Sequence, residues 1–268
     1  MLNELDNRVF QHKQFLVQVQ GYSEDSLIGV FAFGSMNYNL FESEFSDVDT
    51  KVIYLPSYKE LVFEKPISEL YLYGNEHIEV KDIRLMVEMF KKQNINFVET
   101  LFTNFSWINP RYSYLWANTF YAYRHMISSY DINYFVNSVC AQAKGNIRSI
   151  QKEYNPKKVV TVLRLYHVLD DFMCLAVPYD VAIYMDNYTR GELLDYKHQN
   201  KILTNEQLEN YYNWFDDFPT NSNISRTQII DKAKMNKLFE QWILAFLTER
   251  QYSKLIPLDV TKEKLPKV

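Results

Sequence analysis

The chain has 268 residues, of which 47% are hydrophobic, and a formal net charge of -4. This length and composition exclude an intrinsically disordered chain and allow one large domain or two small ones. The net negative charge argues against a protein that coats nucleic acid without specificity, but it leaves room for a local basic patch.

The apolar segments and the cysteines disfavour further classes of protein. No segment approaches the roughly 18 apolar residues of a membrane-spanning helix, and the N-terminal residues lack the apolar centre of a signal peptide. We therefore expect a cytoplasmic protein with no membrane partner. Cys140 and Cys174 lie far apart in apolar helical surroundings. They predict buried free thiols and neither a disulfide nor a zinc site.

The first part of the chain alternates between strand and helix patterns. In chain order we expect a helix over 2–20, strands over 27–33 and 47–55, a short helix over 58–62, strands over 69–73 and 77–81, and a helix over 83–92. Gly74 and Asn75 tolerate positive φ and predict a hairpin between the last two strands. Ser57 and Asp82 are placed to cap the helices that follow them.

The second part of the chain is helical by its pattern. This pattern begins at Tyr112 and continues to about residue 250, and Pro110 marks a boundary because proline does not fit inside a helix. We predict an α+β protein with a small mixed sheet flanked by helices over 1–108, an all-helical domain over 109–250 and an extended tail over 251–268. The sequence does not predict the oligomeric state.

One stretch of the first part carries the candidate catalytic residues. Gly34 and Ser35 end the first predicted strand, where a glycine lets the backbone approach a phosphate and the serine offers a hydroxyl. Asp47 and Asp49 face one side of the second predicted strand, because side chains alternate along a strand. Paired carboxylates repel each other unless a cation lies between them, and such oxygen ligands suit Mg²⁺. The alternative is a polar loop followed by two solvated aspartates.

The order and spacing of these residues resemble the signature of the DNA polymerase β-like nucleotidyltransferase superfamily. Gly-Ser follows one strand, Asp-x-Asp lies on the next, and eleven residues separate Ser35 from Asp47. The segments NYNL, SDVDTK, EHIEVKDIRLM, KKQNINFVETLFT and INPRY are similar to a group of predicted bacterial and phage nucleotidyltransferases within it, some associated with RNA repair. The resemblance extends from Gly34 to about Tyr112 and continues at scattered positions to about His167.

The resemblance implies transfer of an NMP from a nucleoside triphosphate to an acceptor hydroxyl, with release of pyrophosphate. Asp47 and Asp49 would hold one or two Mg²⁺ ions, or Mn²⁺ instead, while Gly34 and Ser35 would position the β- and γ-phosphates. The end of an RNA, such as a tRNA-like molecule, is the first choice of acceptor. A protein hydroxyl, a small-molecule acceptor and a nucleotide- or RNA-binding module without turnover are the alternatives.

A third carboxylate is part of what the resemblance implies. Similar proteins carry an acid on a strand beside the Asp-x-Asp strand, and Glu79 occupies that place. By alternation, His77, Glu79 and Lys81 share one face of their predicted strand. Glu79 would complete the metal site or accept the proton of the attacking hydroxyl. The alternative is a half-exposed strand residue without a catalytic role.

A cationic segment over 144–164 contains six cations and a single acid. Lys144, Arg148 and Lys152 are four residues apart and so form one stripe of a helix. Arg164 lies on the next predicted helix, in a Leu-Arg-Leu triplet that similar proteins also carry. We expect a clamp for a triphosphate or an RNA backbone, with Lys144 and Arg164 as the leading nucleotide-binding residues. The alternative is an ordinary solvated helix face.

Overall fold

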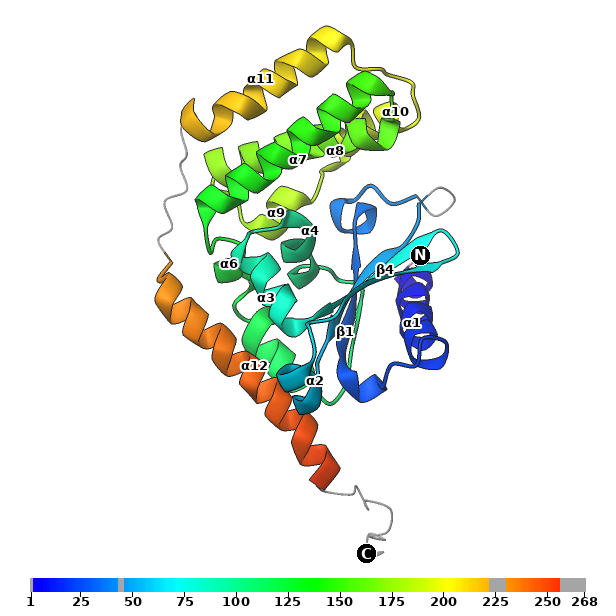
Figure 1. Cartoon of the computed structure of the whole chain (residues 1–268). Helices are drawn as coiled ribbons and strands as arrows, with labels where there is room; N and C mark the ends of the chain where they lie inside the picture. Colours follow the sequence, from blue (N-terminus) through cyan, green and yellow to red (C-terminus); the bar gives the residue numbers. More distant parts are fainter. Residues whose placement is uncertain (1, 43–45, 222–229, 256–268) are drawn as a thin grey trace, which may run out of the picture.

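The structure is a computed structural model that describes residues 2–42, 46–221 and 230–255. These residues form a five-stranded mixed sheet and a set of helices that make up most of the second half of the chain (Figure 1). The predicted α+β class and the helical second half are therefore confirmed.

Parallel and antiparallel pairing both occur in the sheet. Its strands are β1 (Leu27–Phe33), β2 (Asp49–Tyr54), β3 (Ser68–Tyr73), β4 (Glu76–Asp82) and β5 (Ser106–Ile108). They lie in the order β3-β4-β2-β1-β5. β2 and β4 are parallel, whereas the other neighbouring pairs are antiparallel. In the β2–β4 register, Lys51 lies opposite Glu79.

Two details of the strands bear on the site. The ladder between β1 and β2 ends where Phe33 pairs with Asp49, so β2 begins two residues later than predicted. Asp47 and Val48 consequently lie just outside the ladder. The predicted hairpin between β3 and β4 is confirmed, and Gly74 has a φ of 62° at its turn.

Helices cover both faces of the sheet (Figure 1). The α-helices are α1 (Leu2–Gln18), α2 (Tyr58–Phe63), α3 (Ile83–Lys91), α4 (Ile95–Val98), α5 (Ser113–Trp116), α6 (Arg124–Ile127), α7 (Ile132–Lys152), α8 (Pro156–Leu169), α9 (Tyr179–Ile183), α10 (Asn187–Lys197), α11 (Asn205–Asn221) and α12 (Lys232–Leu255). The 3₁₀ turns are η1 (Glu24–Ser26), η2 (Ser35–Tyr38) and η3 (Glu99–Leu101), and the π-helical turns are η4 (Ala117–Tyr121) and η5 (Asp170–Cys174).

Local capping explains where several helices begin. Ser57 and Glu60 form a capping box at α2. Asp82 accepts a hydrogen bond of 2.8 Å from the N–H of Arg84 at the start of α3. Asn155 caps α8, whose first residue is Pro156. Each cap satisfies N–H groups that have no partner within the helix, and the predicted caps at Ser57 and Asp82 are confirmed.

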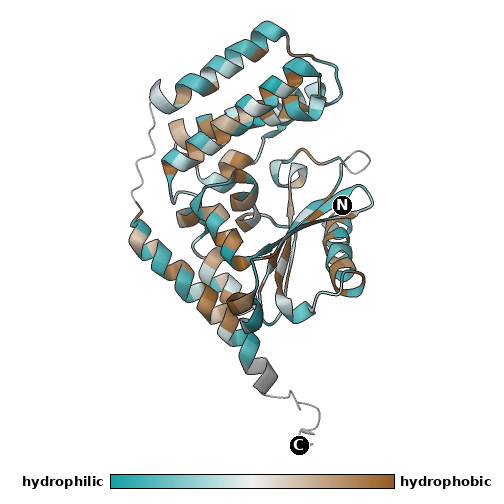
Figure 2. Ribbon diagram, viewed as in Figure 1, coloured by the Kyte–Doolittle hydropathy of each residue, from teal (hydrophilic) through white to brown (hydrophobic). Residues whose placement is uncertain are grey.

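Buried apolar side chains form two clusters, one on each side of the sheet. The smaller one packs α1 against the sheet and includes Leu5, Val9 and Val52. The larger one continues from the other side of the sheet into the helices, and it includes Phe31 and Val139 on either side of the predicted boundary at 108/109. In Figure 2 hydrophobic (brown) stretches occur in the sheet and in the helices that pack on it, whereas much of α11 is hydrophilic (teal). The helical half thus packs directly on the sheet.

The C-terminal prediction needs a correction. α12 continues to Leu255, so residues 251–255 are helical and do not belong to an extended tail. The physical reason is that no proline or glycine interrupts α12, and the first proline after it is Pro257. The remainder of the predicted tail, 256–268, lies outside the described residues.

The structure bears on two expectations from the sequence, namely that the cysteines are free thiols and that no helix spans a membrane. Both Cys140 and Cys174 are free thiols, as predicted, and Cys140 is buried while Cys174 is half-buried. Among the helices of the described residues, none combines the length and the apolar character that crossing a bilayer requires.

A glycine in β1 provides a test of the sheet register. A Cβ at Gly29 would lie 3.0 Å from the backbone oxygen of Trp107 on β5 and 2.7 Å from the buried ring of Phe31. We expect Gly29→Ala to destabilise the protein by about 1–3 kcal/mol, because neither neighbour has room to move. Gly145→Ala is the matched control, since its Cβ meets nothing on the exposed side of α7; a helical alanine there stabilises by about 0.5–1 kcal/mol. Chemical denaturation measures both, and equal effects would contradict the β1–β5 register.

Candidate active site

A cavity of about 300 Å³ lies where the ends of β1 and β2 meet the helical half. From the sheet side it is lined by Gly34, Ser35, Asp47 and Asp49, and from α8 by Lys157, Thr161 and Arg164. The structure therefore brings together five of the seven residues singled out from the sequence. Glu79 and Lys144 do not line this cavity.

The turn after β1 depends on the conformation of Gly34. Its φ of 97° and ψ of -145° belong to a region that side chains rarely adopt. The N–H of Gly34 donates a 2.9 Å hydrogen bond to Oε1 of Glu99. Because that N–H is occupied, Ser35, which begins η2 and lines the cavity, is the member of the pair with groups left for a ligand.

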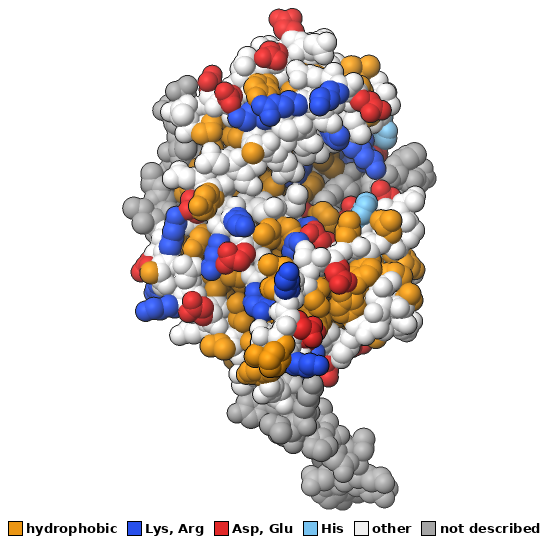
Figure 3. All heavy atoms as spheres, in the orientation of Figure 1, with side chains coloured by type: hydrophobic (Ala, Val, Ile, Leu, Met, Phe, Trp, Pro, Cys, Tyr) orange, Lys and Arg blue, Asp and Glu red, His pale blue; other side chains and the backbone are white. Residues whose placement is uncertain are grey.

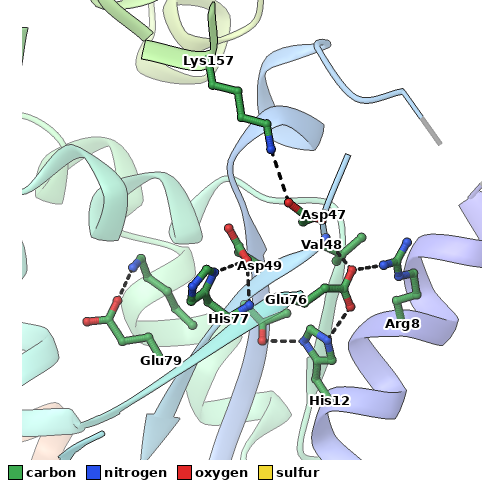
Figure 4. A network of polar contacts seen from close by, with 11 residues as sticks. Arg8, His12, Asp47, Val48, Asp49, Glu76, His77, Glu79 and Lys157 are labelled. Atoms are coloured by element: carbon green, nitrogen blue, oxygen red, sulfur yellow. Dashed lines mark hydrogen bonds and ion pairs between the residues drawn. The ribbon is translucent and has the colours of Figure 1, made fainter. Parts of the chain in front are cut away.

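The two aspartates lie side by side at the start of β2. Oδ1 of Asp49 accepts a 2.8 Å hydrogen bond from the backbone N–H of His77 and lies 3.2 Å from Nδ1 of the same residue. Oδ2 of Asp47 lies 3.5 Å from Nζ of Lys157, which reaches down from α8 (Figure 4). Val48 is buried on the opposite side, as the alternation predicts.

The donor set of this pair fits a magnesium ion. The side chains of Asp47 and Asp49 are 43% and 32% exposed. Within the part of the chain that the structure describes, one oxygen of each carboxylate has no protein partner. Mg²⁺ is commonly held by one or two carboxylates together with waters and substrate phosphates. The described residues contain no group of three or more acid, histidine or cysteine side chains suited to a metal, so protein ligands alone do not complete a cage there.

Glu79 does not join the aspartates, which corrects its expected place in the metal site. Its Oε2 lies 2.5 Å from Nζ of Lys51, and its Oε1 lies 2.9 Å from Nζ of Lys81. Burial opposes the charge of Glu79, but the hydrogen bonds and charges of both lysines outweigh it and hold the pKa of its carboxyl below the usual range. In Figure 4 it points away from the site. The β2–β4 register places Glu79 opposite Lys51, and it is His77 that lies beside Asp49.

Lys144 also lies elsewhere than expected. Its Nζ forms a 2.6 Å ion pair with Oδ1 of Asp216 on α11, and Arg148 donates a hydrogen bond to the hydroxyl of Tyr212 on the same helix. Figure 3 shows Lys and Arg side chains in a row over the helical half, with acidic side chains close to them. Two members of the predicted stripe, Lys144 and Arg148, therefore contact α11, and Lys144 does not line the cavity with Arg164.

Arg164 is the predicted cation that does reach the cavity. It is only 4% exposed, and its guanidinium carbon lies 3.7 Å from the centre of the Tyr38 ring. Among the described residues its Nη1 is buried without a hydrogen-bond partner. Burial lowers the pKa of Arg164, although a guanidinium is so strongly basic that it stays protonated at neutral pH. A buried, incompletely bonded cation beside a cavity is a ready partner for an anion.

The carboxyl that faces Arg164 belongs to Glu99. Glu99 is fully buried, bonds to the N–H of Gly34 and accepts a hydrogen bond from the hydroxyl of Tyr38. Burial raises its pKa to about 8, against the opposing effects of Arg164 and of the Gly34 N–H. A carboxyl with a pKa of about 8 carries its negative charge only part of the time at neutral pH, so it compensates the charge of Arg164 incompletely.

Sequence reasoning did not single out three members of this region, although Lys157 is one of the six cations counted in the 144–164 segment. Lys157 and Thr161 line the cavity with Arg164, and their i, i+4, i+7 spacing on α8 was a signal that could have found them. Glu76 is 4% exposed and contacts both α1 and the backbone of Val48. No local pattern marks Glu76, because its partners come from distant segments.

Comparisons with known proteins do not indicate a function for this site. No family model matches the chain, and no curated protein matches its sequence. Functional conclusions therefore depend on the residues of the site.

Burial of Glu99 predicts a pH dependence of stability. Its pKa rises from 4.5 to about 8 on folding, so between these values the folded state binds more protons than the unfolded state. The free energy of unfolding should therefore fall as the pH rises from about 4.5 to about 8. We expect Glu99→Gln to remove this contribution, so that the difference between wild type and variant shrinks or reverses over that window.

Chemical denaturation at pH 5, 6.5 and 8 measures the effect. Glu88→Gln is the control, because Glu88 is half exposed on α3 and, among the described residues, its carboxylate pairs with Lys91 alone. Its curve should stay parallel to that of wild type. A pH-independent difference between wild type and Glu99→Gln would contradict the raised pKa.

Proposed function

We propose that this protein is a nucleotidyltransferase that transfers an NMP from a nucleoside triphosphate to an acceptor hydroxyl. The observation that carries the proposal is the pairing, in one cavity, of Asp47 and Asp49 with the buried, incompletely bonded guanidinium of Arg164. Carboxylates that suit Mg²⁺ and a cation that suits phosphate, on opposite walls, match the charge distribution of a magnesium-bound triphosphate.

The α8 wall supplies the contacts for the phosphates. Arg164 lines the cavity with an incompletely hydrogen-bonded guanidinium, and the 71% exposed side chain of Lys157 projects over Asp47. Thr161 lies between them along the same face of α8 and lines the cavity. On the sheet side the hydroxyl of Ser35 is available. Anion binding here also relieves the uncompensated charge of Arg164, which favours phosphate over a neutral ligand.

The sheet wall supplies the ligands of the metal. Asp47 and Asp49 would hold one or two Mg²⁺ ions, or Mn²⁺, and such an ion would supply positive charge against the negative charge that develops during transfer. The acceptor oxygen forms its bond to the α-phosphorus as the bond from that phosphorus to the bridging oxygen breaks, and pyrophosphate leaves. Since Glu79 is ion-paired with Lys51 and Lys81, water or an oxygen of the aspartate pair takes the hydroxyl proton.

The acceptor that we propose is the end of an RNA, for which the support is the sequence resemblance. Lys144 of α7 forms an ion pair with Asp216. The cationic stripe of α7 was one argument for RNA binding, and this ion pair weakens it. The position of Glu79 favours one other candidate, a nucleotide-binding module that binds NTP without turnover. A single experiment separates these candidates.

Purified protein is incubated with each α-labelled NTP, Mg²⁺, total tRNA and cell extract, alongside Asp49→Asn. We expect label to enter macromolecules and to be released from them by ribonuclease. We expect no label with Asp49→Asn, because one metal-binding carboxylate is lost. Label that protease releases would move the acceptor to protein. Nucleotide binding without label from any NTP would contradict the transferase and favour the binding module.

The α8 wall predicts a difference between two lysines. We expect Lys157→Met to weaken Mg²⁺–NTP binding by about tenfold, because a charge-assisted phosphate contact contributes on the order of 1.5–3 kcal/mol at most. Lys144→Met, the same change on α7, should leave binding unaltered since Lys144 pairs with Asp216. Fluorescent nucleotide titration measures both affinities. Equal losses for both variants would contradict this location of the phosphates.

A further inference from the structure

A buried carboxylate lies behind the two aspartates, on the α1 side of the sheet. Glu76 is the first residue of β4 and is 4% exposed. Its Oε1 accepts a hydrogen bond of 2.6 Å from the N–H of Val48 and pairs with Arg8. Its Oε2 lies 2.9 Å from Nε2 of His12. Figure 4 shows this carboxylate between α1 and the strand that carries the aspartates.

The bond to Val48 matters because of where the β-ladder ends. The last residue pair of β1 and β2 is Phe33 with Asp49, so the segment before Asp49 receives no ladder hydrogen bond. Val48 therefore depends on Glu76 for its N–H partner. The side chain of Val48 is fully buried on one side of the segment. The hydrogen bond from its N–H to Glu76 therefore also keeps the opposite side, which carries the aspartates, toward the cavity. The direction of Asp47 follows, because it is the next residue along this short extension of the strand.

Glu76 is itself held from two sides by α1. Arg8 pairs with one oxygen, and the fully buried His12 contacts the other. Nδ1 of His12 lies 2.9 Å from the hydroxyl of Thr50, which returns the network to β2 one residue beyond Asp49. A neutral His12 that donates from Nε2 to Glu76 accepts from Thr50 at Nδ1, and burial does lower the pKa of His12. The network thus contacts the residues on both sides of Asp49 in the chain, Val48 and Thr50.

We propose that Glu76 is a positioning residue that aligns Asp47 with Asp49 and thereby sets the affinity of the site for a divalent cation. The proposal rests on the proposed function, because it assumes that this pair binds a metal. It also assigns a role to α1: through Arg8 and His12 the N-terminal helix helps to build a site that it does not line. Partners of this kind typically change metal affinity by about 10–100-fold when they are removed.

A purely structural role would look different. If Glu76 only fastened α1 to the sheet, its loss would lower stability without a selective effect on the aspartates. Glu76→Gln separates the two roles, because the amide oxygen still accepts from Val48 while the charge toward Arg8 is lost. Glu76→Ala removes the acceptor as well. Glu69→Ala is the matched control, since Glu69 is an exposed acid of β3 whose contacts are Tyr22 and Tyr71.

The experiment has two readouts on the full chain. Mn²⁺ alone is titrated by electron paramagnetic resonance, with Asp47→Asn and Asp49→Asn to assign the site. Hydrogen exchange of the Val48 amide reports its hydrogen bond without any metal. We expect Glu76→Ala to weaken Mn²⁺ binding by about 10–100-fold and to speed Val48 exchange, while Glu76→Gln retains most of both and Glu69→Ala matches wild type. Thermal unfolding confirms that each variant is folded.

The outcomes distinguish this proposal from the proposed function. Wild-type affinity in Glu76→Ala, with Mn²⁺ bound by the aspartates, overturns the positioning role and leaves the transferase proposal standing. Wild-type protein that binds no Mn²⁺ at Asp47 and Asp49 overturns the metal-dependent function. In that case Val48 exchange still decides the structural part, because unchanged exchange in Glu76→Ala would show that Glu76 does not hold this segment. Equal weakening by Glu76→Gln and Glu76→Ala would assign the effect to charge and contradict the role of the Val48 hydrogen bond.

Discussion

The burial of Arg164 is the constraint on which the arrangement of the candidate site depends. A guanidinium that is removed from water requires compensation, and here it lies against the ring of Tyr38 and in the field of Glu99. Glu99 also holds the N–H of Gly34, so one buried group links α8 to the turn after β1. The two walls of the cavity are therefore joined by the same contacts that leave part of Arg164 available for an anion.

Five acids near the cavity differ in their chemistry because their neighbours differ. Asp47 and Asp49 are partly exposed and keep oxygens directed at the cavity. Glu79 is neutralised by two lysines, and Glu76 holds backbone from the other side of the sheet. Glu99 is buried deeply enough that its protonated form is favoured at neutral pH. The same functional group is thus left partly exposed, paired with lysines, bonded to backbone or buried in support of a turn, according to its surroundings and partners.

The cations are divided in a similar way between structure and site. Those of α7 contact acidic and aromatic residues of α11, as Lys144 does with Asp216. Of those on α8, Lys157 meets Asp47 and Arg164 lines the cavity, whereas Lys158 donates a hydrogen bond to Ser149 of α7. A chain that is acidic as a whole therefore presents positive charge to the cavity from α8 and, through Lys197, from α10. This local field matters more to an anionic ligand than the net charge does.

The sequence by itself determined the elements that follow from local rules. Apolar runs, the caps Ser57 and Asp82, and the Gly74-Asn75 turn identify their strands and helices, since these effects act over a few residues. Alternation likewise placed Asp47 and Asp49 on one face. Only the tertiary structure decided which groups approach them. Glu79 has the right parity, but the β2–β4 register sets it opposite Lys51. Lys144 meets Asp216, Glu99 meets Gly34 and Glu76 meets Val48 across separations of 72, 65 and 28 residues. Such contacts arise when distant segments pack together, and no pattern within one segment encodes them.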